Sequence, residues 1–192
     1  MTGKNLPGIL DRQENLGVGM TCIAAIIKDG KAYMAGDRAV VDESQQMKSD
    51  IPKIWKSGDY LFGYCGTLEG QIIQNNFVPP KPEGNIDKFM RGKFLEEIKK
   101  FYEKWGMPAD KDSDLTLLIC VKGRMYEHES INLTMISYDT NFAAIGSGSA
   151  YAMGSLHATQ NYKDPKRRLT SALDAAILYS PHCLYPIDFL SK

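Results

Sequence analysis

The sequence has no long hydrophobic run and no excess of charge of either sign. Lys plus Arg number 23 among its 192 residues, and Asp plus Glu also number 23, so the formal net charge at pH 7 is zero. A neutral chain lacks the positive surface that binds nucleic acids or anionic membranes. The longest apolar runs, 22–27 and 115–121, are far shorter than the roughly 20 residues that span a membrane. We therefore expect no nucleic-acid partner and no membrane segment.

Cysteine and histidine are few and scattered. Cys22, Cys65, Cys120 and Cys183 show no paired spacing, and the three histidines lie far apart in the sequence. This pattern is unlike that of a zinc site or a disulfide framework, and it fits a reducing cytoplasm. The first 20 residues also lack the apolar stretch of a signal peptide. We expect a cytoplasmic protein that uses no metal and no cofactor.

Beyond residue 20, runs of strand-like sequence alternate with runs of helix-like sequence. Apolar periodicity and turn dipeptides predict strands over 21–28, 31–37, 53–55, 60–65, 114–121, 124–128, 132–138 and 184–189, and helices over 67–77, 86–105, 150–158 and 167–178. A polar loop is expected between the second and third strands. The pattern indicates one α+β domain over 21–192, preceded by a leader or propeptide-like segment, 1–20.

Thr21 opens the first predicted strand directly after the leader. A threonine with a free α-amine carries both a hydroxyl nucleophile and a base, since an α-amine has an ordinary pKa of about 7.7–8.0. This is one way to activate a hydroxyl without a histidine. Taken alone, Thr21 is more simply a β-branched residue that begins a strand.

Asp37 and Lys53 stand at the ends of predicted strands, where side chains can meet at one edge of a sheet. An ammonium near a hydroxyl favours the ionised oxygen, and a carboxylate beside that ammonium keeps it charged. The plainer interpretation is a surface ion pair, which a chain with this many charged residues forms in several places.

Two glycine-containing junctions lie between a predicted strand and a predicted helix. The run AIGSGS over 144–149 allows backbone amides and the Ser147 hydroxyl to approach another chain segment, but it lacks the lysine of a phosphate-binding loop. The second junction contains Gly63, Gly66 and Thr67, and either glycine is a candidate to direct a backbone N–H at a developing oxyanion.

This set of features resembles the N-terminal-nucleophile (Ntn) hydrolases of the proteasome β-subunit family, including the peptidase rings of bacterial ATP-dependent proteases. The resemblance rests on TCIAAI, AGDRA, IPKIW, GYCGTLEG and AIGSGSAYAMGSLHA, and on the spacing from Thr21 to Asp37 and to Lys53. It covers residues 21–192. It implies the Ntn hydrolase fold, a four-layer αββα sandwich of two antiparallel sheets between helical layers.

The resemblance also implies a role for each matching residue. Thr21 is then the nucleophile, with its amine as base, and Lys53 lowers the pKa of the hydroxyl. Asp37 orients that lysine, Gly66 donates its backbone N–H to the oxyanion, and Ser147 contacts the amine. The implied protein is a threonine endopeptidase subunit of a self-compartmentalising homo-oligomeric ring, which cleaves unfolded protein or peptide substrates supplied by an ATP-dependent unfoldase.

Two departures from the family pattern keep alternatives open. Met20, not glycine, precedes Thr21, so activity requires that residues 1–20 are removed or that Met20 is the true start. The family also carries a second aspartate and a serine near its last helix, where Asp174 is not clearly in register. One alternative is a catalytically silent, unprocessed structural subunit. Another is an Ntn amidohydrolase for small amides, with Cys22 as the nucleophile.

The predicted helix 86–105 carries an unusual number of aromatic residues. A single helix does not normally leave so many of them in water. We therefore expect part of this helix, or of its neighbours, to be buried between subunits of the ring.

Overall fold

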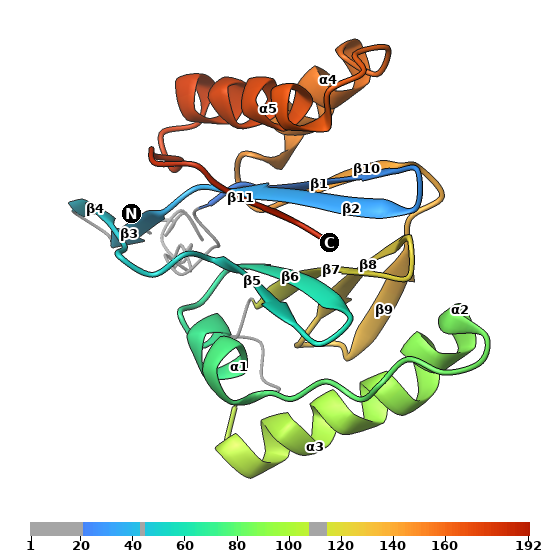
Figure 1. The fold of residues 1–192 in the computed structure, drawn as a ribbon. Coiled ribbons are helices and arrows are strands. Elements are labelled where there is room, and N and C mark those ends of the chain that lie inside the picture. The colour runs from blue at the N-terminus through green and yellow to red at the C-terminus, as the bar shows by residue number, and fades with distance from the viewer. Residues whose placement is uncertain (1–20, 43–44, 108–114) are drawn as a thin grey trace, which may run out of the picture.

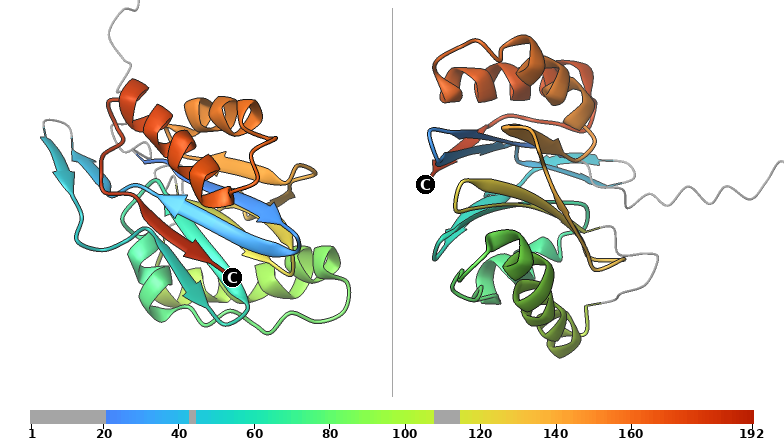
Figure 2. Two further views of the ribbon diagram at one scale, coloured as in Figure 1. Left: turned by 45° about the horizontal axis from the view of Figure 1, so that its top comes forward. Right: turned by 90° about the vertical axis from the view of Figure 1, so that its right-hand side faces the viewer.

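The computed structural model describes residues 21–42, 45–107 and 115–192. The predicted leader, 1–20, lies outside the described residues. Two antiparallel sheets pack face to face, and helices cover the outer face of each sheet (Figure 1). Figure 2 shows the four layers edge-on. The predicted α+β sandwich is therefore confirmed.

The first sheet contains four strands in the order β10-β1-β2-β11. Their bounds are β1 Ile23–Lys28, β2 Lys31–Gly36, β10 Phe142–Ile145 and β11 Asp188–Ser191. Asp29 and Gly30 join β1 to β2, and both have the positive φ that a primed hairpin turn requires. Two helices cover the outer face of this sheet, α4 (Ser149–Ala158) and α5 (Pro165–Tyr179) (Figure 1).

The second sheet contains five strands in the order of the chain, β5-β6-β7-β8-β9. Their bounds are β5 Ile54–Ser57, β6 Tyr60–Cys65, β7 Thr116–Val121, β8 Arg124–Glu129 and β9 Thr134–Ser137. Its outer face packs on α1 (Gly70–Asn76) and on a long helical segment made of α2 (Ile86–Phe89), a π-helical turn (Met90–Phe94) and α3 (Leu95–Trp105).

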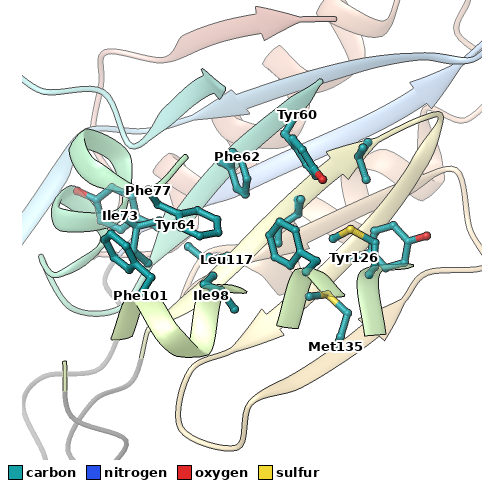
Figure 3. Close-up of a cluster of buried hydrophobic side chains, with 14 of the residues drawn as sticks. Tyr60, Phe62, Tyr64, Ile73, Phe77, Ile98, Phe101, Leu117, Tyr126 and Met135 are labelled. Atoms are coloured by element: carbon teal, nitrogen blue, oxygen red, sulfur yellow. The ribbon is translucent and has the colours of Figure 1, made fainter. Parts of the chain in front are cut away.

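The aromatic residues of the long helical segment belong to the core of this chain. Phe89, Phe94, Phe101 and Tyr102 are buried in one cluster with aromatic and aliphatic side chains of the second sheet. Figure 3 shows part of a buried hydrophobic cluster, with Phe101 and Ile98 of α3 labelled. Trp105, by contrast, is 44% exposed. The sheet of the same chain covers these four aromatic side chains, so they give no reason to place the helix between subunits. The expected burial of part of this helix, or of its neighbours, between subunits stays a prediction.

Between the sheets, small and aliphatic side chains form a thinner core. Its members include Ile23, Met34, Ile54, Leu61, Leu118 and Cys120. A Cβ added at Gly36 or Gly63 would lie 2.6 or 2.5 Å from the Ile23 side chain. Glycine at these two positions therefore allows the sheets to approach closely beside Ile23, two residues from Thr21.

The expected polar loop between the second and third strands is instead a hairpin. Strands β3 (Ala39–Asp42) and β4 (Gln45–Lys48) pair with each other and lie to one side of the two main sheets (Figure 1). A short, polar hairpin without a clear apolar alternation gives little strand signal in the sequence. The last strand is also shifted, from the predicted 184–189 to Asp188–Ser191, because Pro186 has no backbone N–H to donate to a partner strand. No helix among the described residues is long and apolar enough to cross a membrane.

A buried histidine connects the second sheet to α3. His128 on β8 has no exposed surface; its Nδ1 lies 2.7 Å from the Thr134 carbonyl and its Nε2 2.9 Å from the Tyr102 hydroxyl. Since a carbonyl only accepts, Nδ1 carries the proton and Nε2 accepts from Tyr102. Burial lowers the pKa of His128 to about 4, although the Thr134 carbonyl and Glu129 favour the charged ring.

The His128 pKa generates a prediction about acid stability. Because this pKa lies below the ordinary 6.5, the neutral ring contributes stability that is complete above pH 6.5 and is lost as pH falls through 4. We expect the free energy of unfolding, measured by urea titration, to fall by about 3 kcal/mol over this range through His128. His128→Asn retains a donor for Thr134 and should flatten the pH dependence. If the unfolding free energy of His128→Asn depends on pH as steeply as that of the parent chain, the contribution assigned to His128 is contradicted. His157→Asn, at an exposed site, is the control.

Candidate active site

Thr21 lies at the end of an inner strand of the first sheet, two residues before β1 begins. The residue is 1% exposed, and its hydroxyl donates a hydrogen bond to the Asp37 carboxylate. Asp37 directly follows β2, whose last residue, Gly36, pairs with Ile23 on β1. The hairpin register therefore places Asp37 beside Thr21.

Asp37 is fully buried and accepts four hydrogen bonds. Oδ1 accepts from the Thr21 hydroxyl and from the Cys22 amide at 3.0 Å. Oδ2 accepts from the amides of Ala39 at 3.1 Å and Leu184 at 3.0 Å. These donors come from three separate parts of the chain, so the carboxylate connects β1, the β3 hairpin and the segment after α5.

Lys53 enters the same region from the start of β5. It is 5% exposed, and its ammonium donates to the Ala39 carbonyl. Burial lowers the pKa of Lys53 from its ordinary value, while the negative charge of Asp37 opposes this shift. Since Asp37 and Lys53 are both buried, the surface ion pair that was the plainer interpretation of the sequence is excluded.

The 146–148 turn brings Ser147 to the backbone of Thr21. Ser147 Oγ lies 3.3 Å from the Thr21 nitrogen and 3.4 Å from the Thr21 carbonyl oxygen, and the Gly148 amide donates to that carbonyl at 3.2 Å. Gly146 has φ 90, and a Cβ there would lie 2.3 Å from the Thr21 carbonyl oxygen. Glycine at this position therefore permits the close approach.

Of the two candidate oxyanion donors, Gly66 is placed better. Gly63 lies inside β6, opposite Ile54 and Leu118, so its backbone belongs to the sheet. Gly66 directly follows β6, is half-buried and has φ 96, which glycine adopts readily. Gly66 accordingly stays the predicted donor.

Cys22, the alternative nucleophile, is fully buried. Burial raises the pKa of its thiol well above the ordinary value, and neighbouring Cys183 and Asp37 add to the shift. The protonated, inaccessible thiol is a poor nucleophile. Its side chain belongs to the same buried cluster as Leu169 and Leu173 of α5.

Sequence reasoning missed the turn that follows α5. Leu184 donates its amide to Asp37 and accepts from the Arg38 amide at 3.4 Å. Because these contacts use backbone groups, no side-chain pattern in the sequence marks them. Asp174, which was considered for this region, instead accepts from the Tyr185 hydroxyl in an exposed contact on α5.

The described residues contain no group of three His, Cys, Asp or Glu side chains that could hold a metal ion. The site is instead a buried hydroxyl, carboxylate and ammonium, with the hydroxyl of the exposed Ser147 against the Thr21 backbone. Such a set can orient a hydroxyl nucleophile and stabilise its ionised form.

Three curated bacterial proteins, each named ATP-dependent protease subunit HslV, are similar to the chain in sequence. The protein of Enterococcus faecalis is 26% identical over 147 residues, which is 75% of this chain and 78% of the relative. That of Pseudothermotoga lettingae is 28% identical over 147 residues, 72% of this chain and 77% of the relative. That of Caldicellulosiruptor saccharolyticus is 26% identical over 170 residues, which is 86% of this chain and 92% of the relative. No model of a known protein family matches the chain.

Solved structures show the same fold. Thiobacillus denitrificans BPH in complex with epoxomicin superposes with a TM-score of 0.73 at 16% identity, covering 90% of this chain and 98% of that one. HslV from Trypanosoma brucei superposes with a TM-score of 0.66 at 20% identity, covering 89% of this chain and 98% of that one. Anbu from Yersinia bercovieri superposes with a TM-score of 0.65 at 14% identity, covering 90% of this chain and 81% of that one.

The fold is therefore that of the proteasome-type Ntn hydrolases. The sequence similarity to HslV subunits and this fold together support a proteasome β-subunit-like family.

The four hydrogen bonds of Asp37 generate a prediction about stability. In Asp37→Asn, the amide NH₂ faces a backbone donor in either orientation, because each carboxylate oxygen accepts from at least one backbone amide. We expect the free energy of unfolding to fall by about 3 kcal/mol in urea titrations. Asp59→Asn, at a half-exposed carboxylate 4.0 Å from Lys122, is the matched control and should change it by less than about 0.5 kcal/mol. Equal losses in the two variants would contradict the role of Asp37.

Proposed function

We propose that this protein is a threonine-type peptidase subunit of a self-compartmentalising, proteasome-like ring. In this proposal Thr21 cleaves amide bonds once residues 1–20 are removed and its α-amine is exposed. The observation that carries the proposal is the convergence of Thr21, Asp37, Lys53 and Ser147 from four separate chain segments. The first three are buried together, and the exposed Ser147 lies against the Thr21 backbone.

The proposed reaction uses the Thr21 nitrogen as the base. Without the leader, this nitrogen is an α-amine with an ordinary pKa of about 7.7–8.0, so much of it is neutral near pH 8. The amine takes the hydroxyl proton while Oγ1 attacks the substrate carbonyl carbon. The leaving amine of the substrate receives that proton, and an ester forms on Thr21. Water, deprotonated by the same amine, then hydrolyses the ester and restores Thr21.

The surrounding groups support these steps in different ways. The positive charge of Lys53 favours the ionised Thr21 oxygen, and the charge of Asp37 favours the ammonium form of Lys53. Gly66 would donate its backbone N–H to the oxyanion of the tetrahedral intermediate. Ser147 Oγ, 3.3 Å from the Thr21 nitrogen, would orient the amine.

The proposed assembly rests on the sequence relatives. Three of them carry the name ATP-dependent protease subunit, which describes a peptidase that works with an ATP-driven partner. By this similarity we propose a homo-oligomeric ring that receives unfolded chains from an unfoldase. Nothing in this argument depends on Phe101 and Tyr102 of α3, which the chain buries itself.

A catalytically silent structural subunit is the competing proposal. It is favoured by the sequence itself, because the 20 residues before Thr21 make its nitrogen an amide, which cannot act as a base. However, a silent subunit has no need of a buried lysine, whose desolvation costs stability. The enzymatic proposal accounts for that cost and is preferred. The buried Cys22 thiol gives the small-amide alternative no support.

Exposure of Thr21 generates the central prediction. A chain that begins at Met20 should lose this methionine to ordinary processing, start at Thr21 by mass spectrometry, and hydrolyse unfolded-peptide substrates. Thr21→Ala in that chain should lower kcat about a thousandfold or more, while Thr21→Ser keeps part of the activity. Light scattering should show the same oligomer in all three. Should the chain assemble with a free Thr21 and cleave nothing, even with candidate unfoldases, the structural proposal replaces the enzymatic one.

Lys53 generates a second prediction about catalysis. Lys53→Ala should lower kcat far more than it raises KM, and Lys53→Arg should not restore it, because a planar guanidinium does not replace a compact ammonium. Burial lowers the Lys53 pKa from its ordinary 10.5, so the ammonium loses its proton at a lower pH than an ordinary lysine does. As the pH is raised, activity should therefore begin to decline before pH 10.5 is reached. Lys56→Ala, at an exposed lysine on the same hairpin, is the control. Full activity in Lys53→Ala would contradict the assignment.

A further inference from the structure

Arg38, the residue directly after Asp37, connects two other segments of the chain through its side chain. Its Nε and Nη2 donate to Oδ2 and Oδ1 of Asp188 on β11, at 2.7 and 2.8 Å, and its Nη1 donates to the Asp50 carbonyl at 2.9 Å. The hydrogen bonds to Asp188 raise the pKa of Arg38 above its ordinary value, so the guanidinium stays charged. We call these three side-chain contacts the Arg38 bridge.

The Arg38 bridge lies at the base of the hairpin that β3 and β4 form (Figure 1). The Arg38 carbonyl accepts from the Ser49 amide at 2.9 Å, and Nη1 holds the carbonyl of the next residue, Asp50. The Arg38 amide donates to the Leu184 carbonyl at 3.4 Å. Backbone and side-chain groups of Arg38 therefore close the base of the hairpin and connect it to β11 and to the turn after α5.

The hairpin base also carries the acceptor of the Lys53 ammonium. Lys53 donates to the carbonyl of Ala39, the residue after Arg38, and the Ala39 amide donates to Asp37 at 3.1 Å. Lys53 itself follows Asp50 by three residues. Arg38 thus joins the two backbone segments that meet in this contact: the one that offers the carbonyl and the one that brings the lysine.

We propose that Arg38 is a positioning residue for Lys53, because its bridge to β11 and to the Asp50 carbonyl keeps the ammonium in its buried place. The inference rests on the proposed function, in which Lys53 favours the ionised Thr21 oxygen, and it adds the group that holds the lysine there. A lysine does not replace this arginine, since an ammonium lacks the planar fork that meets a carboxylate and a carbonyl at once.

Loss of the Arg38 bridge should change the ionisation of Lys53. Burial lowers the Lys53 pKa, whereas the surrounding groups Asp37, Cys65 and Cys183 favour the ammonium. Without the bridge, the two backbone segments can separate and water can reach the ammonium, so the effect of burial shrinks and the pKa rises toward its ordinary value. A merely structural role for Arg38 would lower stability but would leave this pKa unchanged.

The first test measures the Lys53 pKa in the full 192-residue chain. The pKa is obtained from the pH dependence of competitive acetylation with acetic anhydride, followed by mass spectrometry of the peptide that contains Lys53. We expect a higher Lys53 pKa in Arg38→Ala than in the parent chain. Arg124→Ala is the matched control, because it removes an arginine whose Nη2 lies 3.2 Å from Asp87 in a more exposed ion pair. Equal Lys53 pKa values in Arg38→Ala and Arg124→Ala would overturn the proposal.

Two further variants separate the bridge from the charge of Arg38. Arg38→Lys keeps the positive charge without the fork, so its Lys53 pKa should lie between those of the parent chain and Arg38→Ala. Asp188→Asn leaves the contact to Asp50 in place, and it should raise the Lys53 pKa by less than Arg38→Ala does. If Arg38→Lys has the Lys53 pKa of the parent chain, the charge suffices and the role of the bridge is refuted.

Kinetic measurements separate this inference from the proposed function. In the chain that begins at Met20, Arg38→Ala should lower kcat about tenfold with KM unchanged, because the ammonium leaves its place. The alkaline limb of the kcat profile should move to higher pH, as the Lys53 pKa does, and Arg124→Ala should change neither. An inactive parent chain would contradict the proposed function, while the shifted Lys53 pKa would still support the positioning role. A parent-like kcat and alkaline limb in Arg38→Ala would overturn that role in an active enzyme.

Discussion

The buried carboxylate of Asp37 is the interaction on which the site depends. A fully buried charge is costly unless hydrogen bonds replace its hydration, and Asp37 accepts from one hydroxyl and three backbone amides. Those amides belong to the start of β1, the β3 hairpin and the turn after α5. The carboxylate therefore fixes three chain segments around Thr21, and any change in their packing is felt at the nucleophile.

The sandwich makes this arrangement possible because strand ends of the two sheets meet at one end of the molecule. Thr21 and Asp37 come from the first sheet, and Lys53 comes from the second. The glycines that face Ile23 let the two sheets meet closely beside Thr21. The outer helices add a rigid support, because α5 packs on β1 and delivers the turn that contacts Asp37.

The chemistry proposed for this site needs neither a histidine nor a metal. His128 is part of the structural core between β8 and α3, His157 is exposed on α4, and His182 lies in the turn after α5 but has no part in the proposed steps. Activation of Thr21 would come from its own amine, from a buried ammonium and from oriented hydroxyls. In such a site, small changes in hydrogen-bond direction alter proton transfer.

The sequence by itself determined the α+β pattern, most of the strands and helices, and the choice of Thr21, Asp37, Lys53, Gly66 and Ser147 as candidates. It did so because local periodicity, turn dipeptides and the spacing of these residues along the hairpins are properties of short segments. Only the tertiary structure decided that Phe89, Phe94, Phe101 and Tyr102 are core, that residues 39–48 form a hairpin, and that the 180–184 turn contacts the site. Those outcomes depend on contacts between distant segments, many through backbone amides that any residue carries.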